Sequence, residues 1–440
     1  MTNSVAVTTK SNCCFCLKSI IIIPVIFIGI FLCTFIFSMA VDIILFDRAS
    51  WRDHLLPLVY TRPVGDLHIG ILSLAEKWGK IFNCKSSYYT EPYLAVRFPT
   101  LITTAEVIVL KANICPSDAL IAAIDQLSEG EILYDKTEWI AFRIRSADID
   151  NILTNGYFDS LRPVNLLYDI SYIRYPEDIF RYNSAQLQFD YALMTQGRSS
   201  ESLSGTNQLI GDRIFIEDGV FAECCSFNTT EGPVYLAKGA EISEGSHLRG
   251  NVAIGEHARV KMGTRIYGNV SIGANSTVGG ELSTLVMGAY SAKGHDGYLG
   301  CAVIGNGCNL GAGTSNSNLK NNWKPVSIYD YALDSSRNTD LRKCGLIMGD
   351  YTMSGINTSF NTGTVVGVGV QYARPGYSPK FIPDFSWCTD QHTEEYRWDK
   401  FEEMLRDMKV MKAEPYHDDE TELLRHVYKL TQHNRLKYQF

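Results

Sequence analysis

The sequence predicts an α/β N-terminal domain, then a left-handed parallel β-helix, then a helical tail. Three observations predict this order. Strand-like and helix-like segments alternate from Val41 to about Gly197, an aliphatic residue recurs at every sixth position from Leu236 to Val278, and residues 391–440 contain amphipathic helical patterns. Alternating strands and helices are typical of a Rossmann-type, largely parallel sheet. A period of six is typical of a β-helix with one short strand on each side of a triangular coil.

The composition limits the possible functions. Apolar residues make up 45% of the 440 residues, charged residues make up 20%, and the net charge is −8. A general nucleic-acid binder needs a basic face, so no nucleic-acid partner is expected. None of the 12 cysteines has the spacing of a zinc site, and many of the later ones lie inside apolar segments. We therefore expect reduced, buried thiols in a cytoplasmic protein and no metal-thiolate site.

Residues 1–38 form an apolar extension with three interpretations. Residues 20–41 carry no charge and follow Lys10 and Lys18, which favours a membrane contact. The protein would then be anchored in the inner membrane with its enzyme domains facing the cytoplasm. Alternatively, Met39 directly precedes a predicted strand and is the true start, or Ser38 belongs to the cleavage site of a signal peptide.

The N-terminal domain is predicted over residues 39–197. Its first strand is VDIILF, at residues 41–46, and another is AEVIVLKA, at residues 105–112. Apolar residues at helical spacing predict a helix over residues 65–82. A second helix is expected in SDALIAAIDQL, with Ser117 as its N-cap.

The segment DIILFDRASWRDHLLPLVYTRPVGDLHIGILSLAEKW, at residues 42–78, resembles the start of a bacterial family of sugar nucleotidylyltransferases linked to hexapeptide acyltransferases. The resemblance implies uridylyl or thymidylyl transfer with Mg²⁺ and a nucleoside triphosphate. Arg62 and Lys77 are the cations expected to bind phosphate. The family's glycine-rich phosphate loop is replaced by RASWRDHL. The alternative is therefore a degenerate domain that binds a nucleotide sugar or supports the fold.

The β-helix is predicted over residues 233–390, after a linker and first strands at residues 198–232. Eight branched aliphatic residues follow one another at intervals of six: Leu236, Ile242, Leu248, Ile254, Val260, Ile266, Ile272 and Val278. An aliphatic residue at this spacing points inward and stacks on its equivalents in neighbouring coils. Residues 391–440 are expected to form helices that pack across the coils.

The segment AYSAKGHDGYLGCAVIGNGCNLGAGTSNSN, at residues 289–318, is similar to the acetyltransferase half of bifunctional N-acetylglucosamine-1-phosphate uridyltransferase/glucosamine-1-phosphate acetyltransferases. The resemblance implies that His295 is the general base, because an attacking amine must lose a proton and imidazole titrates near neutrality. Glu281 is the expected carboxylate that stabilises the imidazolium. The co-substrate is expected to be acetyl-CoA.

Further site residues follow from the same resemblance. Tyr298, Asn318 and Lys261 are the expected substrate contacts, and the backbone at Ala312 and Gly313 is expected to approach the cofactor. Ser283-Thr284 stand where the family has lysines, which leaves the identity of the sugar open.

The expected function is acetyl transfer to an amino-sugar phosphate, in the synthesis of UDP-N-acetylglucosamine and cell-envelope polysaccharide. The expected partners are sugar phosphates and nucleotides, and the resemblance implies a homotrimer. The alternative is a non-catalytic scaffold or nucleotide-sugar-binding protein.

Overall fold

The computed structural model describes residues 41–136, 138–390 and 392–438. Residues Met39–Phe440 form one compact unit. The three interpretations of residues 1–38 fall outside the described residues, as does the predicted membrane contact except for Val41. Among the residues that the structure describes, no helix combines the length and apolar character needed to cross a membrane.

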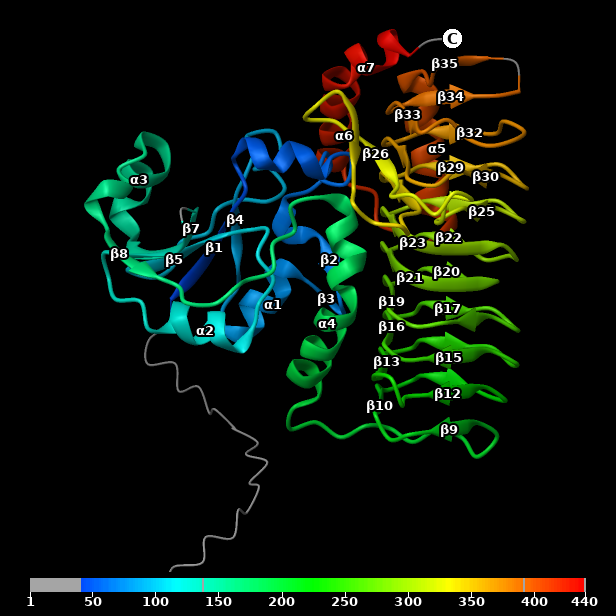
Figure 1. Cartoon of the computed structure of the whole chain (residues 1–440), viewed down its shortest axis with the longest axis horizontal. Coiled ribbons are helices and arrows are strands. Elements are labelled where there is room, and N and C mark those ends of the chain that lie inside the picture. Colours follow the sequence, from blue (N-terminus) through cyan, green and yellow to red (C-terminus); the bar gives the residue numbers. More distant parts are fainter. Residues whose placement is uncertain (1–40, 137, 391, 439–440) are drawn as a thin grey trace, which may run out of the picture. The chain divides into compact units, whose positions relative to one another are not determined.

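The N-terminal domain is built on a mixed six-stranded sheet with the strand order β4-β1-β5-β7-β6-β8 (Figure 1). The strands are β1 (Asp42–Phe46), β4 (Ser87–Tyr89), β5 (Glu106–Lys111), β6 (Glu131–Asp135), β7 (Glu138–Arg145) and β8 (Arg162–Asn165). Strand β1 is parallel to β4 and β5, whereas β7 is antiparallel to both of its neighbours. The predicted α/β class is confirmed, and the sheet is less parallel than expected. The helices of this domain are α1 (Leu74–Ile81), α2 (Asp118–Asp125), α3 (Ile149–Asn155) and α4 (Pro176–Thr195).

The predicted helix over residues 65–82 is wrong in its first half. A small hairpin of β2 (His68–Ile69) and β3 (Leu72–Ser73) occupies that half. Gly70 turns the hairpin with a φ of +83°, which favours glycine. Helix α1 begins only after Ser73, whose hydroxyl accepts a hydrogen bond from Glu76 N at 3.2 Å in a capping box. The predicted cap of α2 is confirmed, because Ser117 Oγ accepts from Leu120 N at 3.4 Å.

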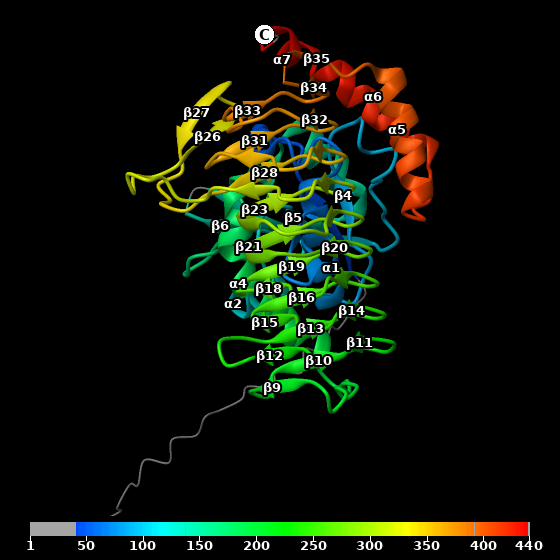
Figure 2. The ribbon, with the colours of Figure 1, turned by 90° about the vertical axis from the view of Figure 1, so that its right-hand side faces the viewer.

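The second part of the chain is a parallel β-helix, as predicted, with strands stacked in three columns (Figures 1 and 2). The first column contains β10 (Ile214–Ile216), β13 (Val234–Leu236), β16 (Val252–Ile254), β19 (Val270–Ile272), β21 (Glu281–Met287), β23 (Tyr298–Ile304), β28 (Leu346–Met348), β31 (Thr364–Val366) and β33 (Phe381–Ile382). The second contains β11 (Phe221–Ala222), β14 (Glu241–Ile242), β17 (Arg259–Val260), β20 (Thr277–Val278), β22 (Ala292–Lys293), β24 (Asn309–Leu310), β29 (Met353–Ser354), β32 (Gln371–Tyr372) and β34 (Ser386–Cys388). The third contains β9 (Gln208–Ile210), β12 (Ser226–Asn228), β15 (His247–Arg249) and β18 (Arg265–Ile266). It continues into the first residues of β21 and then of β23. Two further strands of this column, β25 (Ser315–Asn316) and β30 (Ser359–Phe360), form a separate pair.

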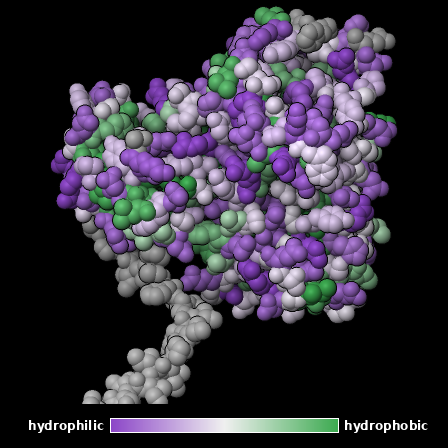
Figure 3. Space-filling view, viewed as in Figure 1, coloured by the Kyte–Doolittle hydropathy of each residue, from purple (hydrophilic) through white to green (hydrophobic). Residues whose placement is uncertain are grey.

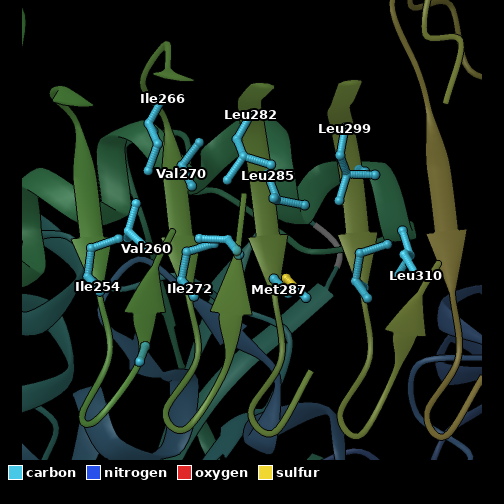
Figure 4. Close-up of a cluster of buried hydrophobic side chains, with 14 of the residues drawn as sticks. Ile254, Val260, Ile266, Val270, Ile272, Leu282, Leu285, Met287, Leu299 and Leu310 are labelled. Atoms are coloured by element: carbon cyan, nitrogen blue, oxygen red, sulfur yellow. The ribbon is translucent and has the colours of Figure 1, made fainter. Parts of the chain in front are cut away.

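The interior of the β-helix is a continuous aliphatic core (Figure 4). None of the eight residues of the six-residue period exposes more than 3% of its surface, so the predicted inward stack is confirmed. The coils already stack at β9 and β10. Phe227 of β12 belongs to the buried interior of the coils, whereas Phe215 of β10 packs outside it with Leu187 of α4. All eight cysteines among the described residues are free, and six of them are buried, as expected for reduced thiols.

Three elements pack beside the coils. Helix α4 lies against β19, β21 and β23. A hairpin of β26 (Ser327–Asp330) and β27 (Ser335–Asn338) leaves the coil and contacts the N-terminal domain through the ion pair of Arg337 with Glu177 at 2.6 Å. The predicted C-terminal helices are α5 (Trp398–Met411), α6 (Asp418–Leu430) and α7 (Gln432–Lys437), which follow β35 (Thr393–Glu395). Helices α5 and α6 lie along one side of the coil stack (Figure 2). Hydrophilic residues cover most of the face in Figure 3, and apolar residues there form small groups.

Candidate functional site

The loop that carries His295 lies between β22 and β23, and the His295 side chain is exposed. Backbone hydrogen bonds tie this loop to two neighbouring segments. Asp296 O accepts from Gly313 N at 3.1 Å, and Gly297 O accepts from Glu281 N at 3.1 Å. The loop therefore connects the predicted cofactor turn with the strand that bears the predicted carboxylate.

A ladder of polar side chains runs across the coils beside this loop. Arg265, Glu281 and Tyr298 occupy equivalent positions in β18, β21 and β23. The Arg265 guanidinium lies 3.8 Å from the Glu281 carboxylate. Within the described chain, no hydrogen bond or ion pair joins Glu281 to His295, so the expected pairing is not formed in this structure. Lys261 lies beyond the end of β17, exposed and outside this ladder.

Arg265 is therefore a candidate site residue that the sequence reasoning missed. Its guanidinium side chain remains about half exposed, with a relative accessibility of 48%. An exposed guanidinium can bind phosphate in a bidentate manner. The signal that could have identified it is the register between β18 and β21, which the sequence period alone does not give.

Two of the predicted substrate contacts lie together. Asn318 Nδ2 donates to Tyr298 Oη at 2.9 Å and lies 3.4 Å from Cys301 Sγ. Burial raises the pKa of Tyr298 to about 12, so its hydroxyl is neutral near pH 7. The pair therefore presents a neutral hydroxyl and an amide, groups that suit the hydroxyls of a sugar.

The predicted cofactor turn is tightly packed against the next coil. Asn357 N donates to Ala312 O at 2.6 Å. Gly313 has a φ of +75°, and a Cβ atom at this position would lie 2.2 Å from Asn357 Oδ1. A glycine is required here both for its backbone conformation and for the close approach of the neighbouring coil.

A cavity of about 1070 Å³ lies between the second column and α5. Asn309, which lines it, pairs with Ala292 in the strand immediately before the His295 loop. The cavity wall also includes Met353, Gly355, Tyr372, Ala373, Trp387 and Tyr396, with Met404, Met408 and Met411 from α5. Charged side chains, among them Arg397, Lys400 and Lys412, also line this cavity. Its size and largely apolar wall suit a ligand site, and methionines adapt well to an irregular occupant.

The two predicted phosphate-binding cations are engaged in internal ion pairs. Lys77 Nζ pairs with Asp190 of α4, and neither side chain has any exposed surface. Arg62 pairs with Asp350, which follows β28 in the β-helix, and its side chain is 12% exposed. The structure thus differs from the prediction. Lys77 holds α1 against α4, and Arg62 holds the N-terminal domain against the coils.

Comparisons with known proteins identify similarities to parts of this chain. Residues 43–199 match the family model described as sugar nucleotidyl transferase. The bifunctional protein GlmU of Methanocaldococcus jannaschii is 41% identical over 73 residues, which are 17% of this chain and 17% of that protein. GlmU of Methanococcus maripaludis strain C5 is 37% identical over 73 residues, again 17% of each chain. The match thus spans a small part of these curated relatives.

The solved structures that match this chain include the UDP-N-acetylglucosamine acyltransferase of Campylobacter jejuni. It is 13% identical, covers 54% of this chain and 97% of its own, and has a TM-score of 0.33. The corresponding enzyme of Francisella novicida is 14% identical, covers 52% of this chain and 84% of its own, and has a TM-score of 0.26. The sequence matches confirm the resemblance to sugar nucleotidyl transferases and GlmU, and they support a transferase.

The N-terminal domain does not present a donor set that fits Mg²⁺. Asn113, which follows β5, contributes only an amide, although its buried Oδ1 has no hydrogen-bond partner. Asp47, which follows β1, is buried and accepts from Arg52 Nε at 3.4 Å and from Val64 N at 2.6 Å. A guanidinium on this carboxylate would repel a divalent cation, which prefers free carboxylate oxygens. In the described residues, no group of three or more His, Cys, Asp and Glu side chains could hold a metal ion.

Proposed function

We propose that the β-helix transfers an acetyl group from acetyl-CoA to the amine of an amino-sugar phosphate, with His295 as the general base. The observation that carries this proposal is the position of the His295 loop. It is hydrogen-bonded to Gly313, four residues after Asn309 of the cavity wall, and to Glu281, beside Arg265 and Tyr298. Acetyl-CoA, bound on the Gly313 side of the loop, and the amino-sugar phosphate, bound on the Glu281 side, would therefore meet at the exposed imidazole of His295.

The proposed step needs a single proton shuttle. The amine nitrogen attacks the thioester carbonyl, and His295 takes the proton that the nitrogen loses as the new N–C bond forms. The C–S bond then breaks, and the imidazolium returns the proton to the departing thiolate. Glu281 supplies a negative charge on the neighbouring strand that favours the imidazolium.

The remaining residues would bind the substrates. Arg265 would pair with the phosphate, and Tyr298 and Asn318 would hydrogen-bond to sugar hydroxyls. The pantetheine arm of acetyl-CoA would pass Ala312 and Gly313 and enter the 1070 Å³ cavity, where apolar and thioether side chains would surround it.

The test compares two histidines of the same β-helix. His295→Asn is expected to lower kcat for release of free CoA with glucosamine 1-phosphate by about 10²- to 10⁴-fold. His257→Asn is the matched control, because His257 is also exposed and its φ of +54° tolerates asparagine. The proposal is refuted if the wild type consumes no acetyl-CoA with any amino-sugar phosphate, or if both variants are equally active.

The wider setting is part of the proposal. The resemblance to GlmU supports a role in UDP-N-acetylglucosamine synthesis in the cytoplasm, and it implies a homotrimer. Light scattering on the purified protein tests the trimer, and a monomeric mass at assay concentration would contradict it.

A second candidate function concerns the sugar nucleotidyl transferase domain. Its family match, its paired cations and its poor fit to Mg²⁺ favour binding of a nucleotide sugar without nucleotidyl transfer. Calorimetry with UDP-N-acetylglucosamine tests binding. Pyrophosphate release from UTP or dTTP with a sugar 1-phosphate and Mg²⁺ would show instead that the domain is an active transferase.

A further inference from the structure

A lysine stands inside the β-helix next to the His295 loop. Lys293 of β22 is the register neighbour of Val278, in the inward column that also contains Val260, and it is 1% exposed. The surrounding column is aliphatic, and removing an ammonium from water is costly. A residue of this kind needs partners that satisfy its donors, and the partners identify its role.

The Lys293 ammonium joins two adjacent coils. Nζ donates to His295 O at 2.6 Å and to Gly279 O at 3.4 Å. Burial lowers the pKa of Lys293 to about 8, and the nearby Asp296 carboxylate partly opposes this shift. The amine can donate these hydrogen bonds in either protonation state.

The other anchors of this loop lie on its later residues. Asp296 O and Gly297 O accept from backbone N–H groups of Gly313 and Glu281. Lys293 provides a side-chain anchor to His295 itself. An aliphatic residue of the same length at position 293 would fill the core and leave that carbonyl without its donor.

We propose that Lys293 is a positioning residue that fixes the backbone of His295 from inside the β-helix and so orients the imidazole. This inference rests on the function proposed above. It adds a residue that acts through His295 and touches neither substrate.

The kinetic test uses Lys293→Met, which keeps the length of the side chain and removes its donors. We expect kcat to fall about 10- to 100-fold, as for a misplaced catalytic group, and KM for both substrates to stay within about twofold. We expect Tm to be unchanged or higher, because apolar replacement of a buried charge is often neutral or stabilising. A wild-type kcat in Lys293→Met would overturn the proposal.

A matched control separates positioning from packing. Ile242 is fully buried in the same column, two register steps before Val278. Ile242→Ala should lower Tm and leave kcat of the folded enzyme unchanged. A loss of kcat in Ile242→Ala equal to that in Lys293→Met would mean that general packing of the coils determines activity, and would also overturn the proposal.

A second measurement does not depend on activity. Amide hydrogen exchange of a peptide covering residues 294–300 should be about tenfold faster in Lys293→Met, the effect of losing a charge-assisted hydrogen bond on local opening. Faster exchange in a protein whose wild type releases no CoA would refute the proposed function and leave the positioning role standing. Unchanged exchange would refute the positioning role whatever the activity.

Discussion

The buried ion pair between Lys77 and Asp190 gives the sharpest test of the N-terminal domain. Both side chains are fully buried, and Asp190 Oδ2 also accepts from Ile71 N at 2.7 Å and from Leu72 N at 3.2 Å. Burial lowers the pKa of Lys77 and raises that of Asp190, while each partner opposes the shift of the other. Lys77→Met removes the cation and leaves the carboxylate alone in the interior.

The magnitude follows from the unpaired charge. Loss of one partner of a buried pair costs about 3–5 kcal/mol, so Lys77→Met should lower the free energy of unfolding by that amount. In the double variant Lys77→Met/Asp190→Asn, the amide oxygen still accepts from Ile71 N and no charge remains. We therefore expect the double variant to be more stable than Lys77→Met, with a coupling energy of about 1–3 kcal/mol.

The assay for stability is urea-induced unfolding followed by tryptophan fluorescence. Nucleotide-sugar binding is measured separately, by calorimetric titration with UDP-N-acetylglucosamine in buffer without urea, at a temperature well below Tm. The reasoning is refuted if Lys77→Met changes the free energy of unfolding by less than about 1 kcal/mol, a cost typical of an ordinary substitution. Loss of nucleotide-sugar binding at unchanged stability would restore Lys77 to the phosphate-binding role that the sequence predicts.

Three further predictions concern the β-helix. The folded-state pKa of Lys293, about 8, lies below its ordinary value of 10.5, so the unfolded chain binds more protons between these values. Wild-type stability relative to Lys293→Met should therefore rise by up to about 3 kcal/mol between pH 8 and pH 10.5 in denaturant titrations, and parallel pH curves would contradict this. Gly313→Ala should destabilise the coil by about 1–3 kcal/mol, because it adds a Cβ at a positive φ, and should raise KM for acetyl-CoA. An unchanged KM in initial-rate kinetics would exclude this turn from the donor site. Arg265→Met should raise KM for an amino-sugar phosphate about tenfold, the loss of a charge-assisted contact, and affect the unphosphorylated sugar less. Equal effects on both sugars would contradict a phosphate contact.

The inward columns could be predicted from sequence because they depend on local period alone. From Leu236 to Val278 the coils keep one length, since the pairs Leu236–Ile254 and Val260–Val278 are each 18 residues apart. The next partner, Lys293, follows after only 15 residues. The shortening already places Arg265 opposite a residue only 16 positions along the chain, Glu281, so this ladder could not be predicted from the six-residue period.

The ion pairs of Arg62 and Lys77 could not be predicted from the neighbouring sequence either. Their partners, Asp350 and Asp190, are far along the chain and reach them only through tertiary packing. The residues next to a lysine or arginine in the sequence do not show whether its side chain is exposed and able to bind phosphate, or buried in an ion pair. The hairpin at residues 68–73 was missed for a related reason, because its apolar residues have helical spacing and only Gly70 indicates a turn.

The buried ammonium of Lys293 also protects the register in which the coils assemble. Stacked repeats with similar aliphatic interiors can mispair by one whole coil at little cost in buried apolar area. In such a misaligned stack, Lys293 would keep the carbonyl of His295, which belongs to its own loop, and would lose the carbonyl of Gly279. The buried amine would then lack one of its two acceptors, which costs about 1–3 kcal/mol. A single polar side chain inside the core thus makes one alignment of the repeats preferred during folding, much as one buried asparagine selects the register of a coiled coil.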